Sequence, residues 1–188
     1  ANLEKKIRGE LERMLRDERE KYEQFWQSLG RQLKVCAMDN YGAKKETLQD
    51  LMLFYSSTEK KLVTLAEYVG RMKEDQKFIY FAAGESVEKI AQLPQTERIR
   101  DKGYEILYFT ENVDEFAVRM MQNYQDKQFQ SVLDSNLDLE SEEEKKELEE
   151  KQESSKDMLE EMKKALEGKV GNVKLSGRLK SHPVCLSS

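Results

Sequence analysis

The run FIYFAA, residues 78–83, is followed by a short polar turn and then by apolar residues at helical spacing. The run ILYF, residues 106–109, is followed by the same two features. Near-continuous apolar strands that each lead into a helix are typical of parallel strands buried on both faces. We therefore predict that these two runs form a parallel pair. The helical positions after the runs are Val87, Ile90 and Ala91 in the first unit and Val113, Phe116, Ala117 and Met120 in the second.

The sequence before this repeat has the apolar spacing of amphipathic helices. Two stripes separated by a polar break at residues 17–21 predict a helical hairpin, and a turn signal at residues 39–42 ends it. A third helix follows, and residues 54–57 predict a short strand. Thr64 and Glu67 have the spacing of a capping box. The stripes are Leu3, Ile7, Leu11, Met14 and Leu15, then Tyr22, Phe25, Trp26, Leu29, Leu33, Cys36 and Ala37, then Leu48, Leu51 and Met52.

After the repeat, Asn112 and Glu115 form a second capping-box pattern, and residues 129–133 predict another short strand. A long acidic helix begins near Ser141 and ends at Gly168. Its first half has no apolar face, whereas its second half carries a stripe that predicts docking. That stripe consists of Met158, Leu159, Met162, Ala165 and Leu166, and two short β-type runs follow it at residues 170–175 and 183–186.

The predicted fold class is therefore mixed, α+β or α/β. An N-terminal helical hairpin with further helices precedes a small α/β lobe, whose parallel strands are covered by helices. A long acidic helix and short strands complete the chain. Because a helical stripe begins almost at residue 1 and two short strands cannot close a core, we expect an internal piece of a longer protein.

Charge and composition exclude several classes of function. Residues 134–167 hold 14 acidic residues against 6 lysines, a net charge of −8, so the rest of the chain carries +3 of the total of −5. Nucleic-acid binding would require clustered Lys and Arg on one face, and a membrane span needs about 20 apolar residues in a row. The sequence predicts a cytoplasmic protein that binds neither nucleic acid nor membranes, with Cys36 and Cys185 as reduced thiols.

The sequence contains no catalytic constellation. The turn at residues 84–86 lies where a phosphate-binding loop would, but it lacks a second glycine and a lysine at Walker spacing. The single histidine, His182, argues against a histidine-based triad or metal site. We predict no catalytic, cofactor-binding or metal-binding residue in this chain.

Many segments, taken in order, resemble the ninety-kilodalton heat-shock chaperone family, bacterial HtpG type. The resemblance covers essentially the whole chain, and so many segments in register make it specific. The segments are YEQFW at 22–26, FYSS at 54–57, TLAEYVGRM at 64–72, QKFIYF at 76–81, GES at 84–86, KGYEILY at 102–108, DEF at 114–116, FQSV at 129–132, the acidic helix, VKLSGRL at 173–179 and SHP at 181–183.

The resemblance implies that residues 1–138 are the later part of a chaperone middle domain. Within it, residues 1–53 are the helical segment and residues 54–138 the small α/β lobe. Residues 139–188 would begin a C-terminal domain, with the boundary near residues 138–142. The family's ATP-binding domain and catalytic loop would precede residue 1, and its dimerising helices would follow residue 188. The chain alone would be no enzyme, whereas the parent would be a homodimeric chaperone that uses ATP and Mg²⁺ to remodel client proteins.

The resemblance also implies two contact surfaces. A client-binding patch falls on Glu115, Phe116 and Arg119, where an aromatic ring beside charged groups suits weak and promiscuous binding. The alternative is that Phe116 packs onto its strand. Lys5 and Lys6 fall on the surface that contacts the seventy-kilodalton chaperone, where paired lysines can meet acidic residues. The alternative there is two solvated lysines.

A function of a different class also stays open, namely a small α/β enzyme or nucleotide-binding module built on the repeated strand-helix unit. The two classes differ in their affinity for ATP. A chaperone segment of this kind should bind ATP no more tightly than millimolar, whereas a nucleotide module should bind it at micromolar concentration.

Overall fold

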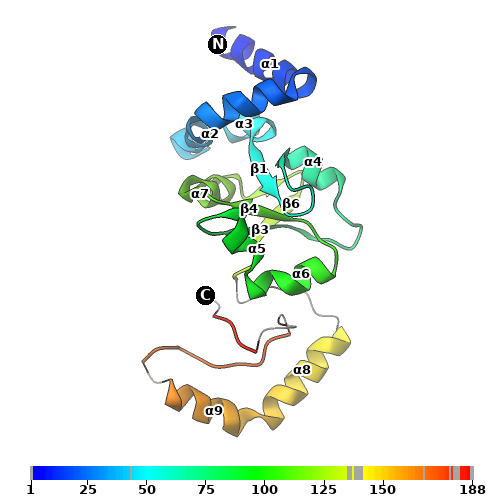
Figure 1. The fold of residues 1–188 in the computed structure, drawn as a ribbon, viewed down its shortest axis with the longest axis vertical. Helices are drawn as coiled ribbons and strands as arrows, with labels where there is room; N and C mark the ends of the chain where they lie inside the picture. The colour runs from blue at the N-terminus through cyan, green and yellow to red at the C-terminus, as the bar shows by residue number, and fades with distance from the viewer. Residues whose placement is uncertain are drawn as a thin grey trace.

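The structure is a computed structural model of the 188-residue chain, and it describes residues 2–42, 44–134, 137, 142–166, 168–177, 179 and 183–186. Three parts follow one another along the longest axis (Figure 1). Helices α1 to α3 form one end, a sheet lies in the middle with helices on both sides, and α8 and α9 with the C-terminal segment form the other end. The predicted mixed α/β class is confirmed.

Helices α1 (Asn2–Asp17) and α2 (Arg19–Gly42) form the predicted hairpin. Glu18 is the single residue between the two helices, and its Oε1 forms an ion pair with Arg13 Nη1 at 2.7 Å. The turn predicted at residues 39–42 is wrong, because α2 continues through Gly42. Turn preferences are weak where a helix can propagate from a long preceding segment. The short helix α3 (Lys45–Leu48) and the 3-10 turn η1 (Gln49–Leu51) follow.

Two of the predicted apolar stripes are partly wrong. In α1, Leu11, Met14 and Leu15 pack against the core, but Leu3 is 72% and Ile7 54% exposed. In α2, Leu29 and Cys36 are exposed. The buried positions of α2 include Tyr22, Trp26, Gly30, Lys34 and Ala37. The prediction missed Lys34 because it assigned only apolar residues to the buried face.

The six-stranded sheet has the order β2-β1-β4-β3-β6-β5 (Figure 1). Its centre is parallel, since β3 (Phe78–Ala83) pairs in parallel with β4 (Ile106–Phe109) and with β6 (Lys127–Ser131). The prediction from the two apolar runs is therefore confirmed. The other pairs are antiparallel, and they add β1 (Leu53–Ser56), β2 (Leu62–Thr64) and β5 (Asn123–Tyr124). The edge strands β2 and β5 were not predicted, because two or three residues carry no periodic signal.

Five short helical elements connect the strands. These are α4 (Leu65–Gly70), α5 (Val87–Ala91), the 3-10 turn η2 (Pro94–Thr96), α6 (Glu97–Asp101) and α7 (Asn112–Met121). The Thr64 capping box is confirmed, since Glu67 N donates to Thr64 Oγ1 at 3.1 Å and Thr64 N donates to Glu67 Oε2 at 2.7 Å. Ser86 Oγ caps α5 by accepting from Lys89 N at 3.3 Å.

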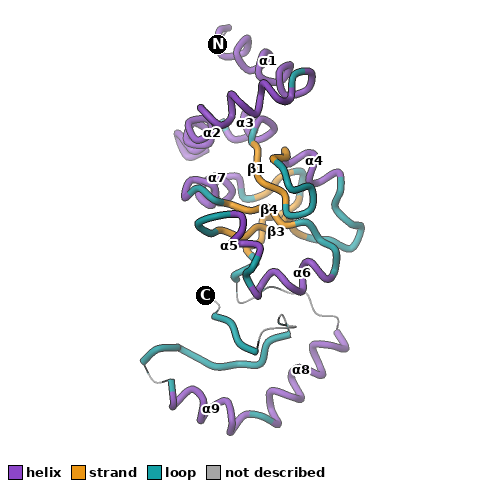
Figure 2. The backbone as a smooth tube through the Cα atoms, in the orientation of Figure 1, coloured by secondary structure: helices purple, strands orange, loops and turns teal. Residues whose placement is uncertain are grey.

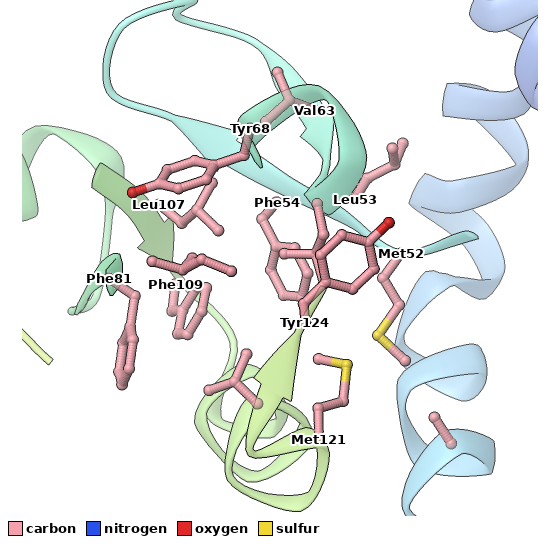
Figure 3. Packing of buried hydrophobic residues seen from close by; sticks show 14 of the residues in the cluster. Met52, Leu53, Phe54, Val63, Tyr68, Phe81, Leu107, Phe109, Met121 and Tyr124 are labelled. Atoms are coloured by element: carbon pink, nitrogen blue, oxygen red, sulfur yellow. The ribbon is translucent and has the colours of Figure 1, made fainter. Parts of the chain in front are cut away.

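Two hydrophobic clusters lie on the two faces of the sheet. Phe81, Leu107 and Phe109 belong to the cluster that contains Trp26 of α2, and Figure 3 shows these strand residues packed with Phe54, Tyr68 and Tyr124. Alternate positions of the same strands enter the second cluster, which α5 and α6 cover; they are Tyr80, Ala82, Ile106 and Tyr108. Because both faces are covered, β3 and β4 have the continuous apolar character of parallel strands.

The C-terminal part differs from the prediction in three ways. The acidic helix is interrupted at Ser155, giving α8 (Glu142–Ser154) and α9 (Lys156–Ala165). Of the predicted docking stripe only Leu159 is buried, whereas Met158, Met162 and Leu166 are 41–50% exposed. The described residues of 168–186 form no strand and appear as loop in Figure 2. Short β-type runs need partner strands to form a ladder, and these runs have none among the described residues.

Candidate functional site

The first turn of α7 lies at the carboxyl end of β4 and defines the candidate site (Figure 1). The second capping box was predicted one residue too late. Glu111 is the N-cap and Asn112 the first helical residue, and Glu111 N donates to Asp114 Oδ2 at 3.1 Å. Asp114 therefore occupies the position expected for Glu115.

Phe116 lies on the outer face of α7 and is 62% exposed. Arg119, three positions later, is also exposed, and Glu115 is half-buried. The inward face is formed instead by Asp114, Ala117, Val118 and Met121. The alternative in which Phe116 packs onto its strand is therefore wrong. The structure brings the three predicted residues onto one turn, as an exposed aromatic ring beside two charged groups.

A buried lysine fixes the orientation of α7. Lys34 of α2 is only 4% exposed, and its Nζ makes ion pairs with Asp114 Oδ1 and, at 3.2 Å, with Glu111 Oε2. The same Nζ lies 5.1 Å from the centroid of the Trp26 ring and 5.4 Å from that of Phe54. Ring faces and carboxylates both attract a cation. These contacts hold Asp114 inside, which turns Phe116 outward.

Burial raises the pKa of Asp114 above its usual range, and the Lys34 ammonium opposes that shift. Loss of solvation disfavours the charged carboxylate, while a neighbouring cation favours it. The buried Lys34 ammonium therefore partly offsets the cost of ionising this carboxyl group in the interior. Lys34 and Asp114 depend on each other.

Sequence reasoning missed Lys34 and the inward position of Asp114. A signal was available in the spacing of Tyr22, Trp26, Gly30 and Lys34, which follow one another at intervals of four. Residues four apart lie on the same face of a helix. A lysine that continues a buried helix face indicates a buried cation, which needs an acidic partner from another element.

Lys5 and Lys6 are both exposed in the first two turns of α1, and neither forms an ion pair with another described residue. They lie beside the exposed Leu3 and Ile7. Figure 1 places the start of α1 at the tip of the molecule, away from α7. The structure therefore does not bring the two predicted surfaces together.

The turn at residues 84–86 and the start of α5 form backbone hydrogen bonds within the fold. Gly84 N donates to Phe109 O at 3.0 Å, Lys89 N donates to Ser86 Oγ, and Ile90 N donates to Ser86 O at 3.0 Å. The Lys89 ammonium pairs with Glu85. A phosphate-binding loop instead presents free backbone N–H groups to its ligand. This geometry argues against a nucleotide module at the repeated unit.

Other kinds of site receive no support from the described residues. They contain no cluster of three or more potential metal ligands, and His182 lies outside them. Cys36 and Cys185 are free cysteines. A shallow recess of about 260 Å³ lies between α8, α9 and Asn172 and Val173, remote from α7. No helix in the described ranges is both long and apolar enough to cross a membrane.

Comparison with known proteins identifies relatives over the full chain. A family model described as "Hsp90 protein" matches residues 1–188. The chaperone protein HtpG of Bacillus subtilis is 56% identical over 187 residues, and that of Clostridium acetobutylicum is 58% identical over 186 residues. These alignments cover 100% and 99% of this chain but 30% of each relative. The chain thus spans about 30% of the length of the curated relatives it matches.

A solved structure is similar in fold as well as in sequence. It is the middle domain of a Plasmodium falciparum heat shock protein, with a TM-score of 0.54 and 29% sequence identity. The superposition covers 57% of this chain and 46% of that one.

Proposed function

Because the chain belongs to the Hsp90 family of chaperones, we propose that it is the later part of the middle domain and the beginning of the C-terminal domain of an HtpG-type chaperone. Residues 1–138 are the middle-domain part and residues 139–188 the C-terminal part. Similarity to a solved middle domain supports this assignment, as does the much greater length of the relatives. Residues 138–141 of the proposed boundary lie outside the described residues.

In this proposal the parent protein works in the cytoplasm as a homodimer that uses ATP and Mg²⁺ to remodel client proteins. The segment itself contributes binding surfaces and no catalysis. The amides of Gly84, Lys89 and Ile90 bond within the fold, which agrees with that division of labour. Calorimetry of this chain with ATP should therefore show no binding tighter than millimolar.

The start of α7 is the proposed client-binding surface, formed by Glu115, Phe116 and Arg119. One observation carries it: Phe116 is 62% exposed on a helix whose orientation is fixed by the buried Lys34–Asp114 pair. A rigidly presented aromatic ring offers apolar contact at little entropic cost. The half-buried Glu115 and the exposed Arg119 add a polar rim that suits many partly folded sequences.

The test is binding of a permanently unfolded protein, reduced and carboxymethylated α-lactalbumin, to Phe116→Ala. Truncating one exposed aromatic anchor should weaken binding about fivefold, since such residues contribute about 1 kcal/mol or more at an interface. Fluorescence anisotropy measures the affinity, and circular dichroism should not change. Met158→Ala is the matched control, because it removes an apolar side chain of similar exposure, 50%, from α9. Equal affinities for the original chain and Phe116→Ala would refute the proposed surface.

Lys5 and Lys6 form the proposed contact for the seventy-kilodalton chaperone. Two adjacent exposed ammonium groups beside exposed Leu3 and Ile7 support it, since acidic side chains and a small apolar area can engage the same patch. Charge reversal at both lysines should lower the rate of association with that chaperone at low salt, and added salt should then speed the association instead of slowing it.

A further inference from the structure

The C-terminal segment, residues 168–186, returns from α9 towards the sheet lobe. In Figure 1 its last residues lie below α5 and α6, between the sheet and the α8–α9 arm. Two side chains of the lobe meet it there. Gln95 Nε2 donates to Leu186 O at 2.7 Å, and Arg98 Nη1 donates to Gly177 O. Gln95 belongs to η2 and Arg98 to α6.

Both hydrogen bonds are made to the main chain of the segment, not to its side chains. Each donor is a side chain and each acceptor is a backbone carbonyl oxygen. The flanking apolar side chains do not enter the lobe, since Val184 is 77% and Leu186 78% exposed. Carbonyl acceptors are present at every residue, so this mode of binding does not depend on sequence.

Gln95 contacts the segment from a nearly buried position. Its residue is only 7% exposed, and its Oε1 is buried without a hydrogen-bond partner among the described residues. A carboxamide presents one acceptor and two donors, which match the N–H and C=O of an extended chain. Among the residues that the structure describes, the segment contacts only the Nε2 of this carboxamide, and the enclosed Oε1 stays unpaired beside it.

We propose that η2 and α6 form a docking ledge for extended polypeptide backbone, with Gln95 and Arg98 as its binding residues and the C-terminal segment of the same chain as its occupant. The ledge ties the C-terminal part of the chain to the sheet lobe. A tethered segment has a high effective concentration, so it occupies such a ledge without strong side-chain contacts. Each lost hydrogen bond should shift the ratio of docked to undocked segment by about fivefold.

The experiment uses the native thiol next to Leu186. With Cys36→Ser, a nitroxide on Cys185 should broaden the backbone amide signals of residues 95–101 in the full 188-residue chain. Gln95→Met with Arg98→Met should remove most of that broadening. Arg100→Met is the matched control, because it removes an equal charge from an exposed position of α6 and should leave the broadening unchanged. The proposal would be overturned if the labelled 188-residue chain with Gln95 and Arg98 intact showed no broadening. It would also be overturned if the broadening persisted in the double variant.

Two further measurements separate the alternatives. The variant Val184→Ser with Leu186→Ser should keep the broadening if the ledge binds only the main chain. Loss of the broadening in this variant would contradict a backbone-binding ledge. Mixing nitroxide-labelled chains with separate isotope-labelled chains should give no broadening. Broadening in the mixture would show that a second copy is the occupant. If the double variant does not fold, as judged from the sheet amides, a chain ending at residue 182 should instead shift the Gln95 side-chain amide signal; an unshifted signal would also refute the proposal.

Discussion

Lys34 shows how one buried cation can determine which face of a neighbouring helix meets solvent. Its ion pairs with Asp114 and Glu111 cross from α2 to α7, and the Trp26 and Phe54 rings cover the ammonium. If Asp114 turned outward, the ammonium would lose its closest counter-ion in a site only 4% exposed. The outward position of Phe116 is therefore linked to a residue in another helix.

Lys34→Met should lower the free energy of unfolding by about 3–5 kcal/mol, because it leaves the Asp114 carboxylate buried without its partner. Adding Asp114→Asn should recover a large part of that loss, since no unpaired charge then remains. Urea unfolding of both single variants and the double variant measures the coupling. Additive effects would show that the two groups do not depend on each other.

The loss caused by Lys34→Met should also depend on pH. Burial already raises the pKa of Asp114, and removing Lys34 removes a contact that lowers it. A carboxyl whose pKa is higher in the folded state than in the unfolded state destabilises the fold when both states are ionised. The deficit should therefore shrink as the pH falls through the folded-state pKa of Asp114.

The face of α7 shows what the sequence could not reveal at the scale of single residues. Val113, Phe116, Ala117 and Met120 have a normal apolar spacing, and the helix itself was predicted correctly. Its rotation was not, because a charged residue takes a core position that an apolar one would normally fill. The position of Lys34 in space explains this exchange; the four-residue spacing that ends at Lys34 indicates a buried face, but it does not identify Asp114 as the partner.

Among the elements, α2 packs closely around a glycine. A Cβ added to Gly30 would lie 2.6 Å from Cδ2 and Cε2 of Trp26. The indole cannot retreat easily, since it stacks near Tyr22 with ring centroids 6.5 Å apart and also faces Lys34. The absence of a side chain at Gly30 thus permits the indole to lie against the backbone of α2.

Gly30→Ala should destabilise the protein by about 1–3 kcal/mol, because overpacking outweighs the gain in helix propensity. Gly9→Ala is the matched control, since an added Cβ at this α1 position meets nothing within 4 Å. It should stabilise the protein by up to about 1 kcal/mol. Thermal unfolding followed by circular dichroism compares the two. The same sign of change for both variants would contradict the packing described at Trp26.

The strands were easier to predict than their edges. The apolar runs at residues 78–83 and 106–109 predicted the parallel centre because covering both faces requires both sets of alternate residues to be apolar. Residues 62–64 and 123–124 form strands mainly through pairing with β1 and β6. Such short strands depend on their neighbours in space, which local sequence does not identify.

For the molecule as a whole, Leu137 marks how far the sheet lobe extends. This residue is 4% exposed and belongs, with Val132, to the cluster covered by α5 and α6.

The client-binding and partner-binding residues of the proposed function are those that the family resemblance implies. Their exposure follows from the packing of α1 and α7 in the structure.

A chain ending at residue 138 should keep the unfolding midpoint of the sheet lobe, because it retains both hydrophobic clusters. Leu137→Ala in that shorter chain should cost about 2–5 kcal/mol, the usual penalty for emptying a buried leucine site. Differential scanning calorimetry measures both. A shorter chain that fails to unfold cooperatively would show that α8, α9 and the C-terminal segment help to form the core.

The strand order also has a consequence for synthesis of the chain. The central strand β3 has its two parallel neighbours, β4 and β6, later in the sequence, and Phe78 pairs with Gln128. A ribosome that has released only β1 to β3 therefore presents an apolar strand with neither neighbour available. Chains with such non-local pairings fold slowly and are prone to aggregate until the strands pair. Translation pauses placed before residue 127 should thus raise the demand of this nascent chain for ribosome-bound holdases.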